Sequence, residues 1–186
     1  MGIVIVRKKE LVTKTWAGGT TTQLFIFPPE AEYTQFNFIC RMSYATVEVE
    51  ESTFTFMPGV ARHLMILKGR LEIDHTGRYK KTLEPFARDI FDGEWPTTAK
   101  GKVTDFNLMT RENAKGNLSS LIMEKGETKR FDLSENRFTG LFVWKGEIIT
   151  GKEKLNEGDF LLAENETEIN LLPVNGCELI VAAIKI

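Results

Sequence analysis

Cysteine is scarce in this chain of 186 residues, which contains only Cys40 and Cys177. The two lie far apart in the sequence, and neither belongs to the CxxC pattern that structural zinc sites and dithiol redox sites need. Both are therefore expected to be free, buried thiols.

Histidine is equally scarce, with only His63 and His75. A metal site in a small β-barrel usually needs an HxH pair, a further His and a Glu, because imidazoles from adjacent strands must converge on one ion. Neither histidine has another two residues away, so we expect no metal and no cofactor. His63 alternates with apolar residues and should pack with them, whereas His75 is expected in a hairpin. This shortage also disfavours hydrolase chemistry that needs a histidine base.

The chain has no excess of one charge and no long apolar run. Its 24 Lys and Arg residues against 26 Asp and Glu residues give a formal net charge of −2. That balance provides no general attraction to nucleic acid or anionic lipid. Apolar runs stay well below the roughly 18 residues that span a bilayer, and the opening MGIVIVRKKE reverses the order of a signal peptide. We expect a cytoplasmic protein with no nucleic-acid or membrane partner.

What is present instead is a period-two pattern of β-branched and aromatic residues, interrupted by Gly, Pro, Asn and Asp. This pattern predicts an all-β protein. In FNFICRMSYATVEVE both alternating faces are largely apolar, which is typical of a strand covered on both sides in a sandwich or barrel. Further strands are expected at QLFIF, TFTFM, RHLMILKG, TDFNLMTR, NLSSLIME, RFTGLFVWKG, DFLLAE, TEINLLPV and ELIVAAIKI.

A weak internal repeat divides the chain. ILKGRLEI and LEPFARDIFDGE are echoed by VWKGEIITG and LNEGDFLLAENE, with Gly146 corresponding to Gly69. If the repeat is real, each half holds a strand, a hairpin and a return strand, as in a jelly-roll barrel. Chance similarity between KG turns is the alternative. We expect two tandem barrels, residues 1–112 and 113–186, packed closely as one unit, with exchange of strands between halves left open.

The segment TDFNLMTR carries the most specific polar pattern. Asp105, Asn107, Met109 and Arg111 share one face of the expected strand, and the other face is apolar. The polar face is either solvated, as is usual, or lines the interior of a barrel, where it would suit a small polar ligand. The pattern leaves both interpretations open.

Two arginines, Arg41 and Arg62, lie inside largely apolar strands. An interior arginine needs an anionic partner, which is more often a protein carboxylate than a ligand carboxylate or phosphate. As a catalytic acid or base, Asp105 is a better candidate than Glu94, which we expect in an exposed turn.

Taken in order, the segments WAGGTTTQ, RMSYATV, FTFMPGVARHLMILKG, FDGE and DFNLMTR resemble the HutD/Ves family. The resemblance covers about residues 16 to 111 and implies a cupin-like fold with two barrels, associated with histidine utilisation or stress response. By resemblance, the ligand-binding residues are Gln23, Arg41, Ser43, Arg62, Asp105, Asn107 and Arg111. The residues of the structural motif are Trp16, Gly18, Gly19, Phe56, Gly59 and Phe106.

The chain departs from the family pattern at two charged positions. Ala61 stands where many members have an acidic residue before the arginine, and Glu112 replaces a second arginine. The second half matches only as a generic cupin, so no functional residue is carried onto it.

Three functions follow as hypotheses. The first is a metal-free protein that binds a small carboxylate-bearing metabolite. The second is a metal-independent isomerase or lyase with Asp105 as general base. The third is a structural or oligomerisation module whose barrel is filled by side chains. The sequence leaves open whether the protein forms a homodimer.

Overall fold

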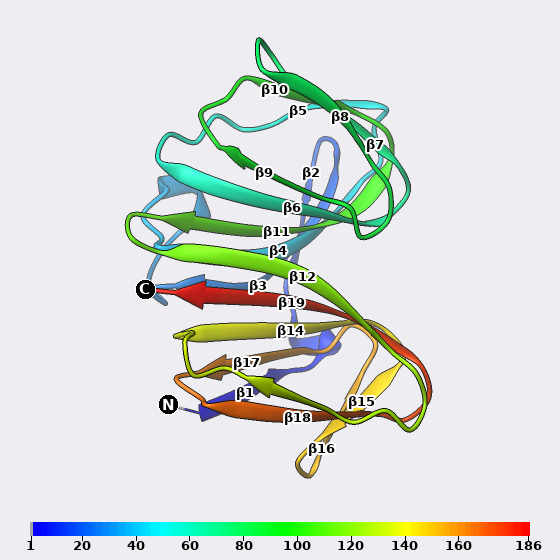
Figure 1. Ribbon diagram of the computed structural model, residues 1–186. Coiled ribbons are helices and arrows are strands. Elements are labelled where there is room, and N and C mark those ends of the chain that lie inside the picture. The colour runs from blue at the N-terminus through cyan, green and yellow to red at the C-terminus, as the bar shows by residue number, and fades with distance from the viewer. Residues whose placement is uncertain (1) are drawn as a thin grey trace. The chain divides into compact units, whose positions relative to one another are not determined.

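The computed structural model describes residues 2–186, which form short antiparallel strands joined by turns (Figure 1). Two single-turn 3-10 helices, η1 (Lys8–Glu10) and η2 (Tyr33–Gln35), interrupt them. The expected all-β class is confirmed. No helix within residues 2–186 is long and apolar enough to cross a membrane.

Contacts divide the chain into two compact units. The central unit is Val12–Ala114, and the terminal unit joins the chain up to Leu11 with Lys115–Ile186. The sequence predicts a division near residue 112 and leaves open an exchange of strands between the halves. The first strand lies in the terminal unit, because residues from Gly2 to Val6 pair with residues from Glu164 to Phe160.

The central unit consists of two sheets. Its six-stranded sheet has the order β2 (Thr13–Trp16), β3 (Gly19–Phe27), β4 (Cys40–Val47), β11 (Val103–Arg111), β6 (Val60–Lys68) and β9 (Arg88–Asp92). Its four-stranded sheet has the order β5 (Glu51–Thr53), β10 (Thr97–Lys100), β7 (Leu71–His75) and β8 (Tyr79–Leu83). Apolar side chains from both sheets, among them Leu64, Ile66, Ile73 and Leu83, form one buried cluster. The two sheets therefore face each other across a shared interior.

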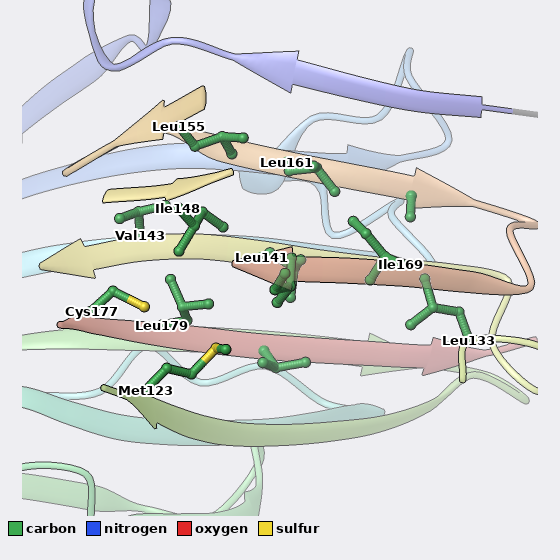
Figure 2. Packing of buried hydrophobic residues seen from close by; sticks show 13 residues of the cluster. Met123, Leu133, Leu141, Val143, Ile148, Leu155, Leu161, Ile169, Cys177 and Leu179 are labelled. Carbon is green, nitrogen blue, oxygen red and sulfur yellow. The ribbon is translucent and has the colours of Figure 1, made fainter. Parts of the chain in front are cut away.

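The terminal unit repeats this two-sheet plan. Its five-stranded sheet has the order β1 (Gly2–Val6), β17 (Phe160–Glu164), β14 (Phe138–Lys145), β19 (Cys177–Lys185) and β12 (Lys115–Met123). Its four-stranded sheet has the order β13 (Lys129–Asp132), β18 (Glu168–Pro173), β15 (Glu147–Thr150) and β16 (Glu153–Asn156). Figure 2 shows the aliphatic side chains of these strands, such as Leu141, Leu179 and Ile148, gathered into one core.

The repeat seen in the sequence is a repeat of structure. In the central unit β6 pairs with β9, and the hairpin β7–β8 lies between them in sequence. In the terminal unit β14 pairs with β17 around the hairpin β15–β16. Gly69 and Gly146 occupy the corresponding turns, both with positive φ. The chance interpretation of the repeat is therefore wrong.

One expected strand is shorter than the pattern predicts. In TFTFM, only Thr53 belongs to a strand, and residues 54–57 are irregular. Phe54 leaves the strand pattern to pack against the central core, whereas Phe56 is exposed. The period-two pattern cannot separate these two outcomes, because it carries no information on where pairing ends.

Candidate functional site

Arg41 and Arg62 lie on the inner face of the central unit, in one row across its six-stranded sheet. Met109 of β11 is paired directly with Arg41 of β4 on one side and with Arg62 of β6 on the other. Directly paired residues of a sheet share a face, and Met109 belongs to a buried apolar cluster. Only 5% of Arg41 and 7% of Arg62 is exposed. Two cations therefore flank one thioether in a buried interior.

Neutral groups hold the Arg41 guanidinium. Its Nε donates to Gln23 Oε1 at 3.0 Å and its Nη1 to Ser43 Oγ at 2.8 Å. The Tyr33 ring lies over it, 4.3 Å from Cζ to the ring centroid. Burial lowers the pKa of Arg41, and the nearby Tyr33 opposes this shift.

Arg62 is less completely satisfied than Arg41. Its Nη2 donates to Asn107 Oδ1 at 3.2 Å, and its Cζ lies 4.6 Å from the Phe54 ring centroid and 5.4 Å from that of Phe91. Its Nε is buried without a hydrogen-bond partner. Burial, above all, lowers the pKa of Arg62 to about 10. A buried polar group without a partner is uncommon in folded proteins and needs an explanation.

We call the side chains of Gln23, Arg41, Ser43, Arg62, Asp105 and Asn107 the arginine cluster, and Asp105 is its carboxyl group. Asn107 Nδ2 donates to Asp105 Oδ1, so the amide lies between the carboxyl group and Arg62. Burial raises the pKa of Asp105 to about 7, although Arg62 and the hydrogen bond from Asn107 both favour its charged form. Asp105 is thus poised between two protonation states near neutral pH.

No carboxylate pairs with Arg41 or Arg62 within 4.0 Å in the part of the chain that the structure describes. The more usual explanation of an interior arginine, an ion pair with a protein carboxylate, is therefore wrong for both. The alternation in β11 is also resolved: Asp105, Asn107 and Met109 are buried in the interior rather than solvated.

Gln23 is the exposed member of the cluster, at the edge that β2 and β3 form. Two shallow hollows of about 250 and 470 Å³ lie elsewhere, one over β7, β8 and β10 and one beside Arg7. Neither is lined by a residue of the arginine cluster.

A second polar cluster of the central unit is built around His75. Its Nε2 lies 2.9 Å from Asp89 Oδ2 and its Nδ1 lies 2.8 Å from Thr97 Oγ1. Tyr79 and Lys81 donate to Asp89 Oδ1 at 3.0 and 3.2 Å. His75 lies near a hairpin turn, as expected, but it is fully buried, and the hydrogen bonds of the whole cluster connect four strands. His63 is also buried.

The arginine cluster does not fit a metal ion. It supplies one carboxyl group and no imidazole, and its two guanidinium groups would repel a cation. Among residues 2–186, no group of three or more His, Cys, Asp or Glu side chains is placed to hold a metal ion.

A comparison with protein families decides the relationship of this chain. The family model named HutD matches residues 8–181. The chain belongs to the HutD family. No curated protein matches this HutD-family chain.

Solved structures agree on the fold. HutD from Pseudomonas fluorescens SBW25 has a TM-score of 0.77 at 21% identity, with 98% of each chain covered. A conserved protein of unknown function from Pseudomonas aeruginosa PAO1 has a TM-score of 0.81 at 19% identity, with 100% of each chain covered. The bacterial pirin YhhW from Escherichia coli, in complex with nickel(II), has a TM-score of 0.75 at 10% identity, with 97% of this chain and 98% of that chain covered. The expected cupin-like fold is thereby confirmed.

Of the seven residues that the HutD resemblance implies for ligand binding, all but Arg111 meet in the arginine cluster. Hydrogen bonds join Arg41 to Gln23 and Ser43, and Arg62 through Asn107 to Asp105. Arg111 stands apart: it ends β11 opposite Val60, its Nε is buried without a partner, and no hydrogen bond joins its guanidinium to the cluster.

The expected motif residues of this HutD-family chain have varied positions. Gly18 and Gly19 allow close packing, since an added Cβ would lie 2.1 Å from the Trp16 ring or 1.9 Å from the Thr46 carbonyl oxygen. Phe106 is fully buried and Gly59 lies in a turn, whereas Phe56 and Trp16 are 63% and 43% exposed.

Three aromatic residues of the site carried no signal in the sequence. The rings of Tyr33, Phe54 and Phe91 contact the guanidinium groups. Tyr33 lies in a 3-10 helix and Phe54 in an irregular segment. Strand alternation predicts neighbours only within a strand, so contacts from such segments escape it.

Proposed function

We propose that this HutD-family protein binds a small metabolite carrying a carboxylate, without a metal ion, at Arg41 and Arg62 of the central unit. The observation that carries the proposal is the presence of two buried guanidinium groups with no carboxylate of residues 2–186 within ion-pair distance. Burying a charge without a partner costs several kcal/mol. An anionic ligand would recover that cost.

The other cluster residues suit recognition of such a ligand. Arg62 Nε is a free donor, Ser43 and Asn107 provide neutral polar atoms, and the exposed Gln23 marks the side from which a ligand would enter. By family resemblance, intermediates of histidine degradation are candidate ligands, and the role would be regulatory, in histidine utilisation or in stress response. We extend the proposal to a cytoplasmic protein, a monomer or homodimer, with no nucleic-acid or membrane partner.

A thermal-shift screen tests the proposal. The purified protein is heated with histidine, urocanate, formylated and free glutamate, and simple dicarboxylates. A ligand at 100 times its Kd adds about 2.7 kcal/mol to the free energy of unfolding. For a chain of this size, that should raise Tm by roughly 5–10 °C.

Two variants locate the binding site. Arg62→Ala should abolish the shift, because loss of a buried charged hydrogen bond costs about 2–5 kcal/mol of binding free energy. Arg70→Ala is the matched control, since Arg70 lies on the surface in exposed ion pairs with Glu72 and Glu84. An unchanged affinity in Arg62→Ala, or no shift with any acid, would contradict the proposal.

A metal-independent enzyme is the second candidate. The raised pKa of Asp105, about 7, suits a general base near neutral pH, and a neighbouring guanidinium could stabilise developing negative charge. Turnover of a bound acid should then disappear in Asp105→Asn while binding survives. Binding without turnover in the wild-type protein would leave only the first proposal.

A structural or oligomerisation module is the third candidate. Met57, Val60, Met109 and neighbouring aromatic residues pack beside the cluster, which favours a filled interior. If no acid stabilises the protein, and Arg62→Met folds and forms the same assembly by light scattering, this function becomes the better one.

A further inference from the structure

Asn107 occupies an unusual position between a carboxyl group and a guanidinium group. Its amide nitrogen donates to Asp105, and its amide oxygen accepts from Arg62. Both sides of one amide are therefore used to connect an acid and a base that do not pair with each other. The spacing leaves Arg62 Nε without a partner.

Asp105 itself lies in apolar surroundings. Its direct neighbours across the sheet are Ala45 of β4 and Ile66 of β6, and Asp105 is 5% exposed. In such a position the charged form is stabilised mainly by Arg62. A ligand carboxylate that approaches Arg62 would place a second negative charge in the same poorly screened interior.

The charged and titratable groups that face this interior come from several elements. They are Arg41 on β4, Arg62 on β6, Arg111 at the end of β11, Tyr33 in η2, Asp89 on β9, His75 on β7, and Tyr79 and Lys81 on β8. The last four are hydrogen-bonded with one another through Asp89. Asp105 is thus the one carboxyl group of the described chain that is hydrogen-bonded into the arginine cluster.

We propose that Asp105 is an internal competitor of the ligand, a carboxylate that must take up a proton from solvent before an anion can bind beside Arg62. This inference rests on the proposed function and adds that the site selects its ligand according to proton availability. Two anions near one buried guanidinium repel each other strongly, so one of them must be neutralised. Once protonated, Asp105 gains a hydroxyl donor that can hydrogen-bond to the ligand.

The pKa values of Asp105 and of a carboxylic acid ligand place the protonation of Asp105 near neutral pH, where the ligand is still ionised. Burial raises the pKa of Asp105 to about 7, whereas a simple carboxylic acid ligand is ionised above about pH 5. Between about pH 6 and about pH 8 the ligand therefore keeps its charge, and Asp105 changes its own.

The test measures acetate affinity by chemical-shift titration at several pH values, and proton uptake by calorimetry in buffers of different ionisation enthalpy. Affinity should fall about tenfold between pH 6 and pH 8, with uptake of about half a proton per bound acetate at about pH 7. Asp105→Asn imitates the protonated side chain, so its affinity should equal the low-pH value of the wild type at every pH.

The control is Asp92→Asn, which removes an exposed carboxylate of β9 and should keep the wild-type pH dependence. Proton uptake is measured on the wild-type protein, so the test does not depend on folding of the variant. Acetate binding without pH dependence or proton uptake overturns the role of Asp105 and leaves the proposed function standing. A pH dependence that persists in Asp105→Asn assigns it to another group and also overturns the inference. Absence of binding by acetate and by every acid of the screen overturns both proposals.

Discussion

The central and terminal units place different side chains at equivalent points of the same strand plan. The row Arg41, Met109, Arg62 of the central unit corresponds to Asn117, Ala183, Thr139 of the terminal unit. One row further along, Ser43, Asn107, Leu64 corresponds to Ser119, Val181, Leu141. The next row pairs Ala45, Asp105, Ile66 with Leu121, Leu179, Val143.

Every charged position of the cluster is therefore neutral in the terminal unit. Leucine replaces the acid, threonine replaces Arg62, and the terminal core is a continuous aliphatic cluster (Figure 2). The strand plan does not require the charges, because the terminal unit folds in the same way without them. This difference supports a role in binding rather than in folding for the arginine cluster.

Transfer of the charge to the terminal unit should have the largest effect. Thr139→Arg would place a guanidinium between Ala163 and Ala183, beside a core of apolar side chains. The free energy of unfolding should fall by about 4 kcal/mol or more, from the unpaired buried charge and from overpacking. Urea denaturation measures the loss.

Thr139→Val is the matched control. The Thr139 hydroxyl is buried without a partner, so its replacement by a methyl group should leave stability unchanged or raise it slightly. A tolerated Thr139→Arg would show that the terminal unit can also accept the charge.

The two units should also differ in how substitutions at equivalent positions change the pH dependence of the free energy of unfolding. The pKa of Asp105 is about 7 in the folded protein and about 3.9 in an unfolded chain. The folded state therefore retains a proton that the unfolded state loses between these values, and stability falls as pH rises from about 4 to about 7. The upper limit of this loss is about 4 kcal/mol.

This loss is measured as the difference in unfolding free energy between the wild type and Asp105→Asn across that pH range. The equivalent position in the terminal unit is Leu179, so Leu179→Val should show no such dependence. A constant difference between wild type and Asp105→Asn would contradict the raised pKa.

The strand plan of both units could be predicted from sequence, because alternation and turn residues are local signals. The site could be predicted only in part. The two faces of β11 are both buried, since Phe106 and Leu108 are as inaccessible as Asp105, and alternation cannot distinguish an interior face from a solvated one. Whether Arg41 and Arg62 have carboxylate partners depends on contacts between distant segments, which a single sequence does not reveal.

Substitution of two equivalent leucines should lower the free energy of unfolding by the same amount in both units. Leu64 and Leu141 occupy equivalent points and are each 1% exposed. Leu64→Ala and Leu141→Ala should each cost about 3 kcal/mol, from lost burial and the cavity left behind. Chemical denaturation tests this. A loss below about 1 kcal/mol for Leu64→Ala alone would mean that the interior beside the arginines is loosely packed.

The smallest expected effect is an increase in the free energy of unfolding. Arg62→Met should raise the free energy of unfolding by about 1 kcal/mol, because removal of a largely buried cation outweighs the lost hydrogen bond to Asn107 and the lost attraction to Asp105. Arg70→Met on the surface should change it by less than about 0.5 kcal/mol. A large loss in Arg62→Met would show that the arginine serves the fold, as the aliphatic residues do in the terminal unit.

The pairing of β1 with β17 imposes an order on biosynthesis. Val6 is made long before its partner Phe160, and at about 5–20 residues per second the ribosome takes roughly 8–30 s to cover that interval. During this time the central unit, which is continuous from Val12 to Ala114, can already fold. The nascent edge strand, in which Ile3 and Val4 stay exposed after folding, remains unpaired until β17 has been made, and a chaperone could bind it throughout that interval.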